Sequence, residues 1–312
     1  MKHIFIINPR SGKKDQTSRI YEMADRLREK HGLDCACMLT DRPGGATDMA
    51  RKIAETGEEV RIYACGGDGT VHEVANGIAG FSNAAMTCIP IGTGNDFLKN
   101  FGEDRAKFED AETLWDGEVQ QLDLIDCNDR LCVTIACNGI DARVAEDVHR
   151  YGKLSMLSGM GSYIASVVVN FLFSSISRKW TVQIDGGDPV TEEFALVSMC
   201  NGRYYGGGFF PVPEARMDDG ILHAVVIRKV TRPEFVRLIG PYSKGRHKDL
   251  PARLIRVMPA KEIRITAEED IVVCLDGECF HYREVVMRLA DKKLNFFGPK
   301  GCTPNATATP KA

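Results

Sequence analysis

A short glycine-rich run at residues 66–70 has the residue types and the position that chemistry on a phosphate requires. It lies between an apolar run at 60–65 that predicts a strand and a segment from Val71 onward that predicts a helix. Glycines there allow a left-handed backbone and let a phosphate approach the main-chain N–H groups. Asp68 adds a carboxylate, which would repel a polyphosphate unless a cation such as Mg²⁺ bridged the two. We interpret the run as a phosphate-binding loop, because a plain turn would need only one glycine.

Two other loops repeat this combination of small residues after a predicted strand. Residues 8–14 precede a predicted helix, whose N-terminus would attract an anion; a plain turn explains this run equally well, and it is not a GxxxxGK[ST] loop. Residues 90–97 end with a carboxylate, Asp96. The carboxyl ends of neighbouring parallel strands face one crevice, so we expect these loops to converge. Thr40, after another strand, either adds a wall to this crevice or belongs to a simple turn.

The first part of the chain alternates between predicted strands and helices. The strands are expected at 4–7, 35–39, 60–65 and 86–91, and the helices at 16–30, 46–56 and 71–78. This alternation predicts an α/β domain with a parallel sheet that is covered by helices. We place the domain at 1–122 and expect the segment at about 290–300 to join it.

The second part is dominated by short strand-like runs separated by turn residues. Strands are expected at 122–126, 131–137, 180–184, 194–200, 221–227, 262–266, 271–275 and 284–289, and helices near 154–176 and 232–243. The pattern predicts a mostly β, antiparallel sandwich or barrel at 123–289. The Thr-, Ala- and Pro-rich tail at 301–312 is expected to be disordered.

Composition excludes several classes of protein. The chain has 312 residues and a formal net charge of −3, so no global basic character indicates nucleic-acid binding. Its eleven cysteines lie in apolar runs and form no CxxC pair, which argues against a zinc site or a disulfide framework. No signal peptide is visible. We expect a reducing, cytoplasmic location.

Two stretches point indirectly to a lipid partner. Residues 154–177 carry no charge and are long enough to span a bilayer, but serines recur every four positions, which favours a buried or interface-facing helix. Its apolar side chains would either line an acyl-chain pocket or pack in a core. Residues 228–261 contain ten Lys or Arg and two acids, which suits either an anionic bilayer or a solvated face. Together they favour an enzyme that docks transiently on the inner face of a membrane.

Taken together, the motifs resemble one family. Asn8-Pro9 with Gly12, the GGDGT run at 66–70 and the GTGNDF run at 92–97 are similar to the catalytic domain of the diacylglycerol and lipid kinases, which include sphingosine kinases. The resemblance continues at 201–208, 211–216, 218–220 and 276–278, so it extends over residues 4 to 297 in family order. GGDGT alone is less specific, because NAD kinases and phosphofructokinases also carry it. The resemblance implies an N-terminal domain of the NAD kinase and phosphofructokinase type.

The resemblance also implies roles for individual residues. ATP would bind along Asn8, Pro9, Arg10, Ser11, Gly12, Thr40, Gly66, Gly67, Asp68, Gly69, Thr70, Val71, His72, Glu73 and Thr93. The acidic group that organises the catalytic Mg²⁺ through water would comprise Asp68, Asp96 and Asp123. Glu278 matches the position of the general base, with Asp276 beside it. A second, structural Mg²⁺ would be held by Asp219 and by backbone oxygens near Arg216 and Ile221.

Two positions depart from the family pattern without touching its motifs. Lys99 stands where an arginine is frequent, and Leu98 where a small residue is common. By itself, Asp276-Gly277 is also a strong hairpin-turn signal, so that Glu278 could simply follow a turn.

These features predict a lipid kinase that transfers the γ-phosphate of ATP to a lipid hydroxyl, most directly diacylglycerol to give phosphatidic acid. An NAD kinase-like enzyme and a non-catalytic nucleotide or lipid sensor are the alternatives, since fold does not fix function. The expected partners are a lipid and the membrane surface. The oligomeric state stays open, with a homodimer as one expectation.

Overall fold

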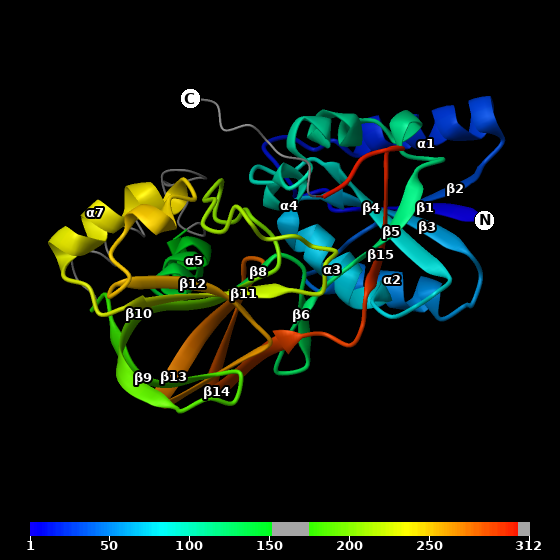
Figure 1. Cartoon of the computed structure of the whole chain (residues 1–312). Coiled ribbons are helices and arrows are strands. Elements are labelled where there is room, and N and C mark those ends of the chain that lie inside the picture. The colour runs from blue at the N-terminus through cyan, green and yellow to red at the C-terminus, as the bar shows by residue number, and fades with distance from the viewer. Residues whose placement is uncertain (152–174, 305–312) are drawn as a thin grey trace. The chain divides into compact units, whose positions relative to one another are not determined.

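The computed structural model describes residues 1–151 and 175–304. The chain forms two compact units, and each contains its own sheet (Figure 1). Among the described residues, one unit contains 1–124 and 291–304, and the other contains the described part of 125–290. The first unit is therefore built from both ends of the chain.

The sheet of the first unit has six strands in the order β2-β1-β3-β4-β15-β5. They are β1 (Lys2–Ile7), β2 (Asp34–Leu39), β3 (Val60–Gly66), β4 (Ala84–Pro90), β5 (Glu118–Leu122) and β15 (Leu294–Gly298). The paired strands are parallel except β5, which runs antiparallel to β15. The helical segments are α1 (Thr17–His31), α2 (Gly45–Ala54), α3 (Asp68–Ile78), α4 (Asp96–Lys99), η1 (Gly102–Glu109) and η2 (Ala111–Thr113). The predicted parallel α/β architecture is confirmed.

The central strands are almost continuously apolar because both faces of the sheet are covered. All residues of β4 except Pro90 are buried, as are all residues of β3 except Arg61. His3, at the start of β1, is a polar exception that is 0% exposed. Its Nδ1 lies 2.9 Å from the Tyr63 hydroxyl, and burial lowers the pKa of this imidazole to about 4.

The sheet of the second unit has nine strands. Eight follow the order β12-β11-β10-β8-β13-β14-β6-β7, and β9 pairs with both β10 and β13. The strands are β6 (Ile125–Cys127), β7 (Arg130–Cys132), β8 (Ile135–Gly139), β9 (Arg178–Ile184), β10 (Val190–Cys200), β11 (Leu222–Arg228), β12 (Ile255–Ala260), β13 (Glu262–Leu275) and β14 (Glu278–Leu289). The unit also contains α5 (Ile140–Tyr151), α7 (Arg232–Ser243) and η3 (His247–Asp249). The prediction of a mostly β, antiparallel second domain is confirmed.

β8 and β9 together occupy one strand position between β10 and β13. β10 pairs with β9 along its first half and with β8 along its second half, antiparallel in both cases. β13 makes the same change of partner. The chain therefore leaves this position after Gly139, where α5 begins, and returns to it at Arg178. β13 bulges at the crossing, with a register shift between Thr266 and Ile271.

The bulge explains a difference from the sequence-based expectation. The strands expected at 262–266 and 271–275 are one strand, β13, which continues through the irregular residues between them. Conversely, the strand expected at 131–137 is divided between β7 and β8. α5 and β12 were not predicted.

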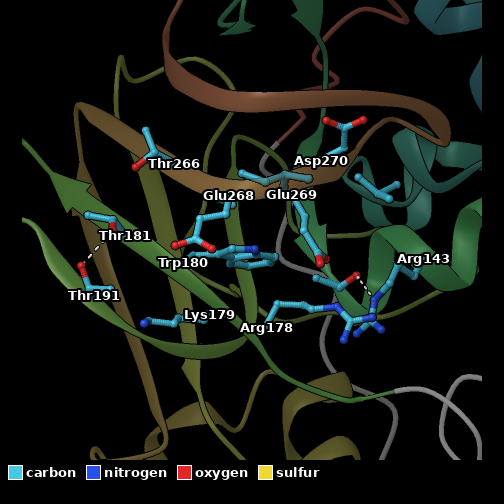
Figure 2. A pocket seen from close by; sticks show the side chains of 14 residues that line it. Arg143, Arg178, Lys179, Trp180, Thr181, Thr191, Thr266, Glu268, Glu269 and Asp270 are labelled. Atoms are coloured by element: carbon cyan, nitrogen blue, oxygen red, sulfur yellow. Dashed lines mark hydrogen bonds between the residues drawn. The ribbon is translucent and has the colours of Figure 1, made fainter.

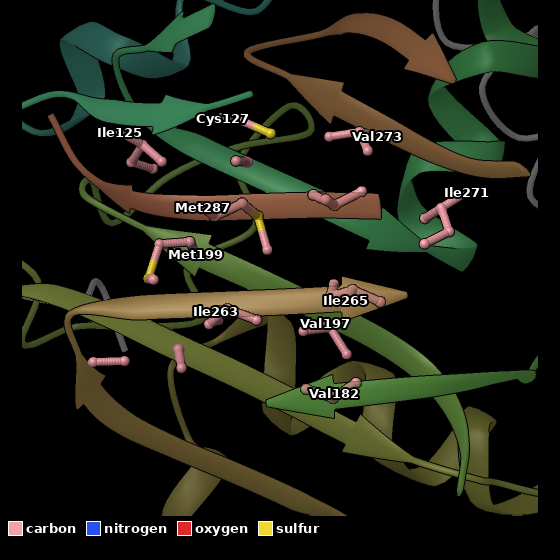
Figure 3. Packing of buried hydrophobic residues seen from close by; sticks show 14 of the residues in the cluster. Ile125, Cys127, Val182, Val197, Met199, Ile263, Ile265, Ile271, Val273 and Met287 are labelled. Atoms are coloured by element: carbon pink, nitrogen blue, oxygen red, sulfur yellow. The ribbon is translucent and has the colours of Figure 1, made fainter. Parts of the chain in front are cut away.

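The face of this sheet that includes Val197, Ile263, Ile265 and Met287 forms a buried apolar cluster (Figure 3). These residues come from β10, β13 and β14, and each is at most 1% exposed. The cluster shows why short alternating strands fold here: each one contributes one buried side chain at every second position.

The helix expected at 232–243 is confirmed as α7. Thr231 and Glu234 form a capping box at its start, in which each side chain accepts a hydrogen bond from the other residue's backbone N–H. The helix expected at 154–176 lies almost entirely outside the described residues. Within the described part of the chain, no helix is both long and apolar enough to cross a bilayer.

His3 makes the stability of the first unit depend on pH. Its pKa rises from about 4 in the folded chain to an ordinary value near 6.5 on unfolding, so the unfolded state binds more protons between these values. Stability should be complete above pH 6.5 and fall as the pH drops toward 4, by about 2 to 3 kcal/mol at the lower end. Urea denaturation followed by tryptophan fluorescence at pH 7.5 and 4.5 measures this loss.

The matched variant is His3→Gln, which cannot titrate. Between the two pH values, we expect this variant to lose less free energy of unfolding than the wild type, by about 2 to 3 kcal/mol. An equal loss in both proteins would contradict the assignment.

Candidate active site

Three loops meet at the carboxyl ends of β1, β3 and β4, which are neighbours in the first sheet. The Asn8 N–H donates to the Cys65 carbonyl at 2.9 Å, and the Ile91 N–H donates to the Gly66 carbonyl at 3.1 Å. The Asn8 side-chain amide also donates to Thr70 Oγ1 at 3.4 Å. The structure therefore joins the predicted phosphate loops at 8–14, 66–70 and 90–97 through their own backbones.

Glycines let these loops approach more closely than any other residue would. A Cβ atom at Gly92 would lie 2.4 Å from the Gly67 Cα, and one at Gly12 would lie 2.2 Å from the Ile91 carbonyl oxygen. Gly12 also has a φ of 81°, in the left-handed region. The three glycines therefore set the spacing between the loops, and they leave a small crevice lined by Gly67, Asp68 and Asn95.

Asp68 connects two of the loops. It occupies the first turn of α3, and its Oδ1 accepts a hydrogen bond from the Phe97 N–H, at the start of α4, at 3.0 Å. Asn95, the residue before α4, has a φ of 48° and donates through its side chain to the Gly92 carbonyl at 2.9 Å. One carboxylate oxygen of Asp68 thus positions the loop at 90–97.

The other oxygen of Asp68 and one oxygen of Asp96 border the same space. A Cβ atom at Gly94 would lie 3.0 Å from Asp68 Oδ2 and 4.0 Å from Asp96 Oδ2, so both carboxylates border the space above this glycine. Asp96 is also paired with Lys99, the residue that departs from the family pattern. Two carboxylates around one space fit Mg²⁺, which commonly takes one or two carboxylates and completes its shell with water and phosphate oxygens.

Asp123, the third predicted member of the acidic group, has a different environment. It follows β5, is 0% exposed and forms an ion pair with Lys293. Among residues 1–151 and 175–304, no three His, Cys, Asp or Glu side chains form a direct metal-binding cluster. A role for Asp123 toward the metal would therefore run through water, as the resemblance implies. Lys293 was missed by the sequence analysis, because nothing in its sequence neighbourhood marks it as the partner of a residue so distant in the chain.

Glu73 belongs to the predicted ATP-binding residues, but its carboxylate already accepts hydrogen bonds from the backbone of the first unit. Its carboxylate accepts from the Gly44 N–H at 2.9 Å and the Ala46 N–H at 3.0 Å, and Thr47 donates to its carbonyl. It therefore holds the start of α2. The backbone of Thr40 extends the sheet by donating to the Ile7 carbonyl at 2.9 Å.

The other predicted ATP-binding residues differ in exposure. Thr70, Val71 and His72 are buried in the first turns of α3. Arg10 and Thr93 are exposed on the loops at 8–14 and 90–97. The exposed residues and the loop N–H groups are thus the ones accessible to a nucleotide.

In the second unit, Asp276 and Gly277 form the two-residue turn between β13 and β14. Their φ values are 49° and 104°, which suits the primed turns of tight hairpins. The Asp276 carboxylate accepts from the backbone N–H groups of Val133, Thr134 and Ile135 at 2.6, 2.8 and 3.3 Å. Asp276 is thus an anchor for the turn, whereas Glu278, the first residue of β14, is exposed.

The predicted structural metal site lies in the turn before β11. Asp219 Oδ1 accepts from the Ile221 N–H at 3.0 Å across Gly220, whose φ is 73°. Arg216 forms an ion pair with Asp218 at 3.4 Å. The turn therefore brings Arg216, Asp219 and Ile221 into one short exposed loop.

The two units match two family models. Residues 2–127 match the diacylglycerol kinase catalytic domain. Residues 134–297 match the YegS C-terminal NAD kinase beta sandwich-like domain. The chain belongs to the diacylglycerol kinase and YegS lipid kinase family.

Relatives of this chain include proteins named diacylglycerol kinase in Staphylococcus saprophyticus and Bacillus subtilis. They are 28% and 27% identical to this chain, over 88% of it and 87% and 88% of their own lengths. The fold is also similar to a crystal structure of a diacylglycerol kinase from Bacillus anthracis str. Sterne, with a TM-score of 0.69, 23% identity and coverage of 96% and 97% of the two chains. The chain is accordingly a lipid kinase, and its family implies ATP as the phosphate donor.

Two substitutions can distinguish the role of Asp276 in this kinase from that of Glu278. Asp276→Ala should leave three backbone N–H groups without their acceptor and cost the second unit about 3 kcal/mol. Glu278→Ala, at an exposed position, should change stability by less than about 0.5 kcal/mol. Urea denaturation followed by Trp180 fluorescence in a Trp115→Phe background reports on this unit. Equal stabilities of the two variants would contradict the anchoring role.

Proposed function

We propose that this kinase transfers the γ-phosphate of ATP to the hydroxyl of diacylglycerol and so forms phosphatidic acid. The observation that carries the proposal is the shared space of Asp68 and Asp96 above Gly94, beside loops whose N–H groups can hold phosphates. The names of the relatives support diacylglycerol as the acceptor.

The first unit would hold the nucleotide. The loops at 8–12 and 66–72 present backbone N–H groups and the N-terminus of α3 to the phosphates, which favours negative charge there. Asp68, Asp96 and Asp123 would organise Mg²⁺ through water. When bound, Mg²⁺ neutralises charge that develops on the transferred phosphoryl group.

Glu278 would supply the general base. Its carboxylate is exposed at the start of β14, next to a turn that Asp276 fixes. The fixed turn holds the backbone of Glu278 in place. General base catalysis requires this, because the carboxylate that accepts the proton must reach the hydroxyl at hydrogen-bond distance. The turn at Asp219, with its backbone oxygens, would hold a second, structural Mg²⁺ in the same unit.

We also propose that the kinase is cytoplasmic and docks on the inner face of the membrane through the basic segment at 228–261. Five of its basic residues are in ion pairs: Arg228, Lys229, Arg246, Lys248 and Arg253. Within the described part of the chain, Arg237 and Lys244 have no ion pair, and both are exposed. Val236, beside Arg237 on α7, is 59% exposed. Unpaired cations next to an exposed apolar side chain suit an anionic bilayer surface.

Phosphoryl transfer should depend on Asp68 and Glu278. We expect Asp68→Asn and Glu278→Gln each to reduce kcat on diacylglycerol by at least about 100-fold while the chain stays folded. Glu284→Gln, at an exposed position on the same strand β14, is the matched control and should retain wild-type kcat. Activity of either site variant near that of the wild type would refute its role. Turnover of NAD in preference to diacylglycerol would favour the NAD kinase-like alternative.

Membrane docking should depend on the unpaired cations. Reversing the charge with Arg237→Glu and Lys244→Glu should lower the affinity for phosphatidylglycerol-containing liposomes at least tenfold. Each substitution should remove about 1 kcal/mol or more of binding free energy. Flotation measures the bound fraction, and Lys52→Glu with Arg105→Glu, two exposed cations of the first unit, is the control. Equal flotation of the two double variants would contradict this docking surface.

A further inference from the structure

A cavity of about 430 Å³ lies within the second unit, and the predicted catalytic residues do not line it. Its volume is within the range of small-molecule sites. The lining residues are Gly139, Arg143, Arg178, Lys179, Trp180, Thr181, Thr191, Thr266, Ala267, Glu268, Glu269, Asp270, Ile271 and Val272 (Figure 2). Six of these residues are charged and three carry a hydroxyl group, so the cavity can hold a polar ligand.

The cavity exists because the strand position shared by β8 and β9 is interrupted. Gly139 ends β8 and Arg178 begins β9, while the bulge of β13 at 267–270 curves past the gap. Arg143, in the first turns of α5, bridges the gap. It donates to the Gly139 carbonyl at 3.3 Å, the Ser175 carbonyl at 2.8 Å and the Ile176 carbonyl at 3.1 Å. The hydrogen bonds of Arg143 therefore hold this wall of the cavity together.

Arg143 carries a partly buried charge that forms no ion pair within the described residues, although the negative charge of Asp147 acts on it. All its hydrogen bonds within the described residues go to neutral backbone carbonyls. Burial, and then the positive charge of Arg178, lowers its pKa to about 10, so it stays protonated at neutral pH. Two guanidinium groups that repel each other attract an anion with several oxygens, such as phosphate.

The cavity also carries negative charge that is not neutralised. Asp270 is paired with Arg283, which does not line the cavity. Across the ranges 1–151 and 175–304, neither Glu268 nor Glu269 has an ion pair, and the same holds for Arg178 and Lys179. Charges of both signs therefore face the same space without cancelling each other.

The two glutamates occupy different parts of the cavity. In Figure 2, Glu268 points toward Trp180, whereas Glu269 points toward the side where Arg143 and Arg178 lie together. A negative carboxylate beside an indole is a favourable place for an ammonium group. The two arginines provide the complementary place for an oxyanion.

We propose that this cavity binds a phosphate ester that carries an ammonium group, of the phosphoethanolamine type. The phosphate would contact Arg143 and Arg178, and the ammonium group would lie between Glu268 and Trp180. A simple anion would leave Glu268 without a counterion, and a simple amine would leave the two arginines without one. The proposal concerns binding alone and does not depend on the kinase reaction.

Isothermal titration of the full chain with O-phosphoethanolamine tests this directly. We expect saturable binding with a Kd at or below about 1 mM, and binding at least about tenfold weaker for inorganic phosphate or ethanolamine alone. Trp180 fluorescence in a Trp115→Phe background gives a second readout, because Trp180 lines the cavity. Glycerophosphoethanolamine distinguishes the source of the ligand: its binding indicates a lipid headgroup, and binding of the monoester alone indicates a soluble metabolite.

Two variants remove one half of the site each. Arg178→Gln and Glu268→Gln, both at exposed positions, should each raise the Kd about tenfold. The matched controls are Arg256→Gln on β12 and Glu55→Gln at the end of α2, which do not line the cavity. Neither control should change the Kd.

Three results would overturn the proposal. The first is no binding of either phosphoethanolamine ester up to 10-fold above the expected Kd, about 10 mM. The second is equal affinity for inorganic phosphate, which would make this a plain anion site. The third is wild-type affinity in both Arg178→Gln and Glu268→Gln, which would place the ligand elsewhere.

Discussion

The close approach of Gly67 to Gly92 is the constraint on which the predicted nucleotide site depends. With no side chain at either position, the loops that follow β3 and β4 can lie backbone against backbone. This contact allows one oxygen of Asp68 to reach the Phe97 N–H, while the other borders the space above Gly94 that Asp96 also borders. A methyl group at Gly92 would clash with the Gly67 Cα, so the two loops, and with them the two carboxylates, would have to separate. Glycine is required here for proximity, since neither residue has a left-handed φ.

The acidic residues of the molecule divide into those that build it and those that face outward. Asp276 and Glu73 use their oxygens to hold backbone N–H groups, which fixes a hairpin turn and the start of a helix. Glu278 is exposed at the end of the turn that Asp276 fixes. A rigid turn that carries an exposed carboxylate suits proton transfer, because positioning and chemistry are assigned to different residues. The same division explains why neighbouring acids in one motif should respond so differently to substitution.

Much of the fold was predictable because its signals are local. Continuous apolar runs indicated the parallel strands, and the strand–glycine–helix order indicated the phosphate loops, as in the run that ends at Thr70. Contacts between residues distant in the chain were not predictable. Lys293 pairs with Asp123, and Asp276 accepts from the backbone at 133–135, although nothing in either neighbourhood marks these partners. The interruption between β8 and β9 was equally hidden, because each half resembles an ordinary strand.

The central claim is that the chain phosphorylates a lipid alcohol. Its most direct test is incubation of the purified kinase with γ-labelled ATP, Mg²⁺ and a total lipid extract, followed by mass spectrometry of the labelled products. We predict that the label appears in phosphatidic acid formed from diacylglycerol. Label confined to inorganic phosphate or to a water-soluble acceptor such as NAD, with none in the lipid fraction, would contradict this account.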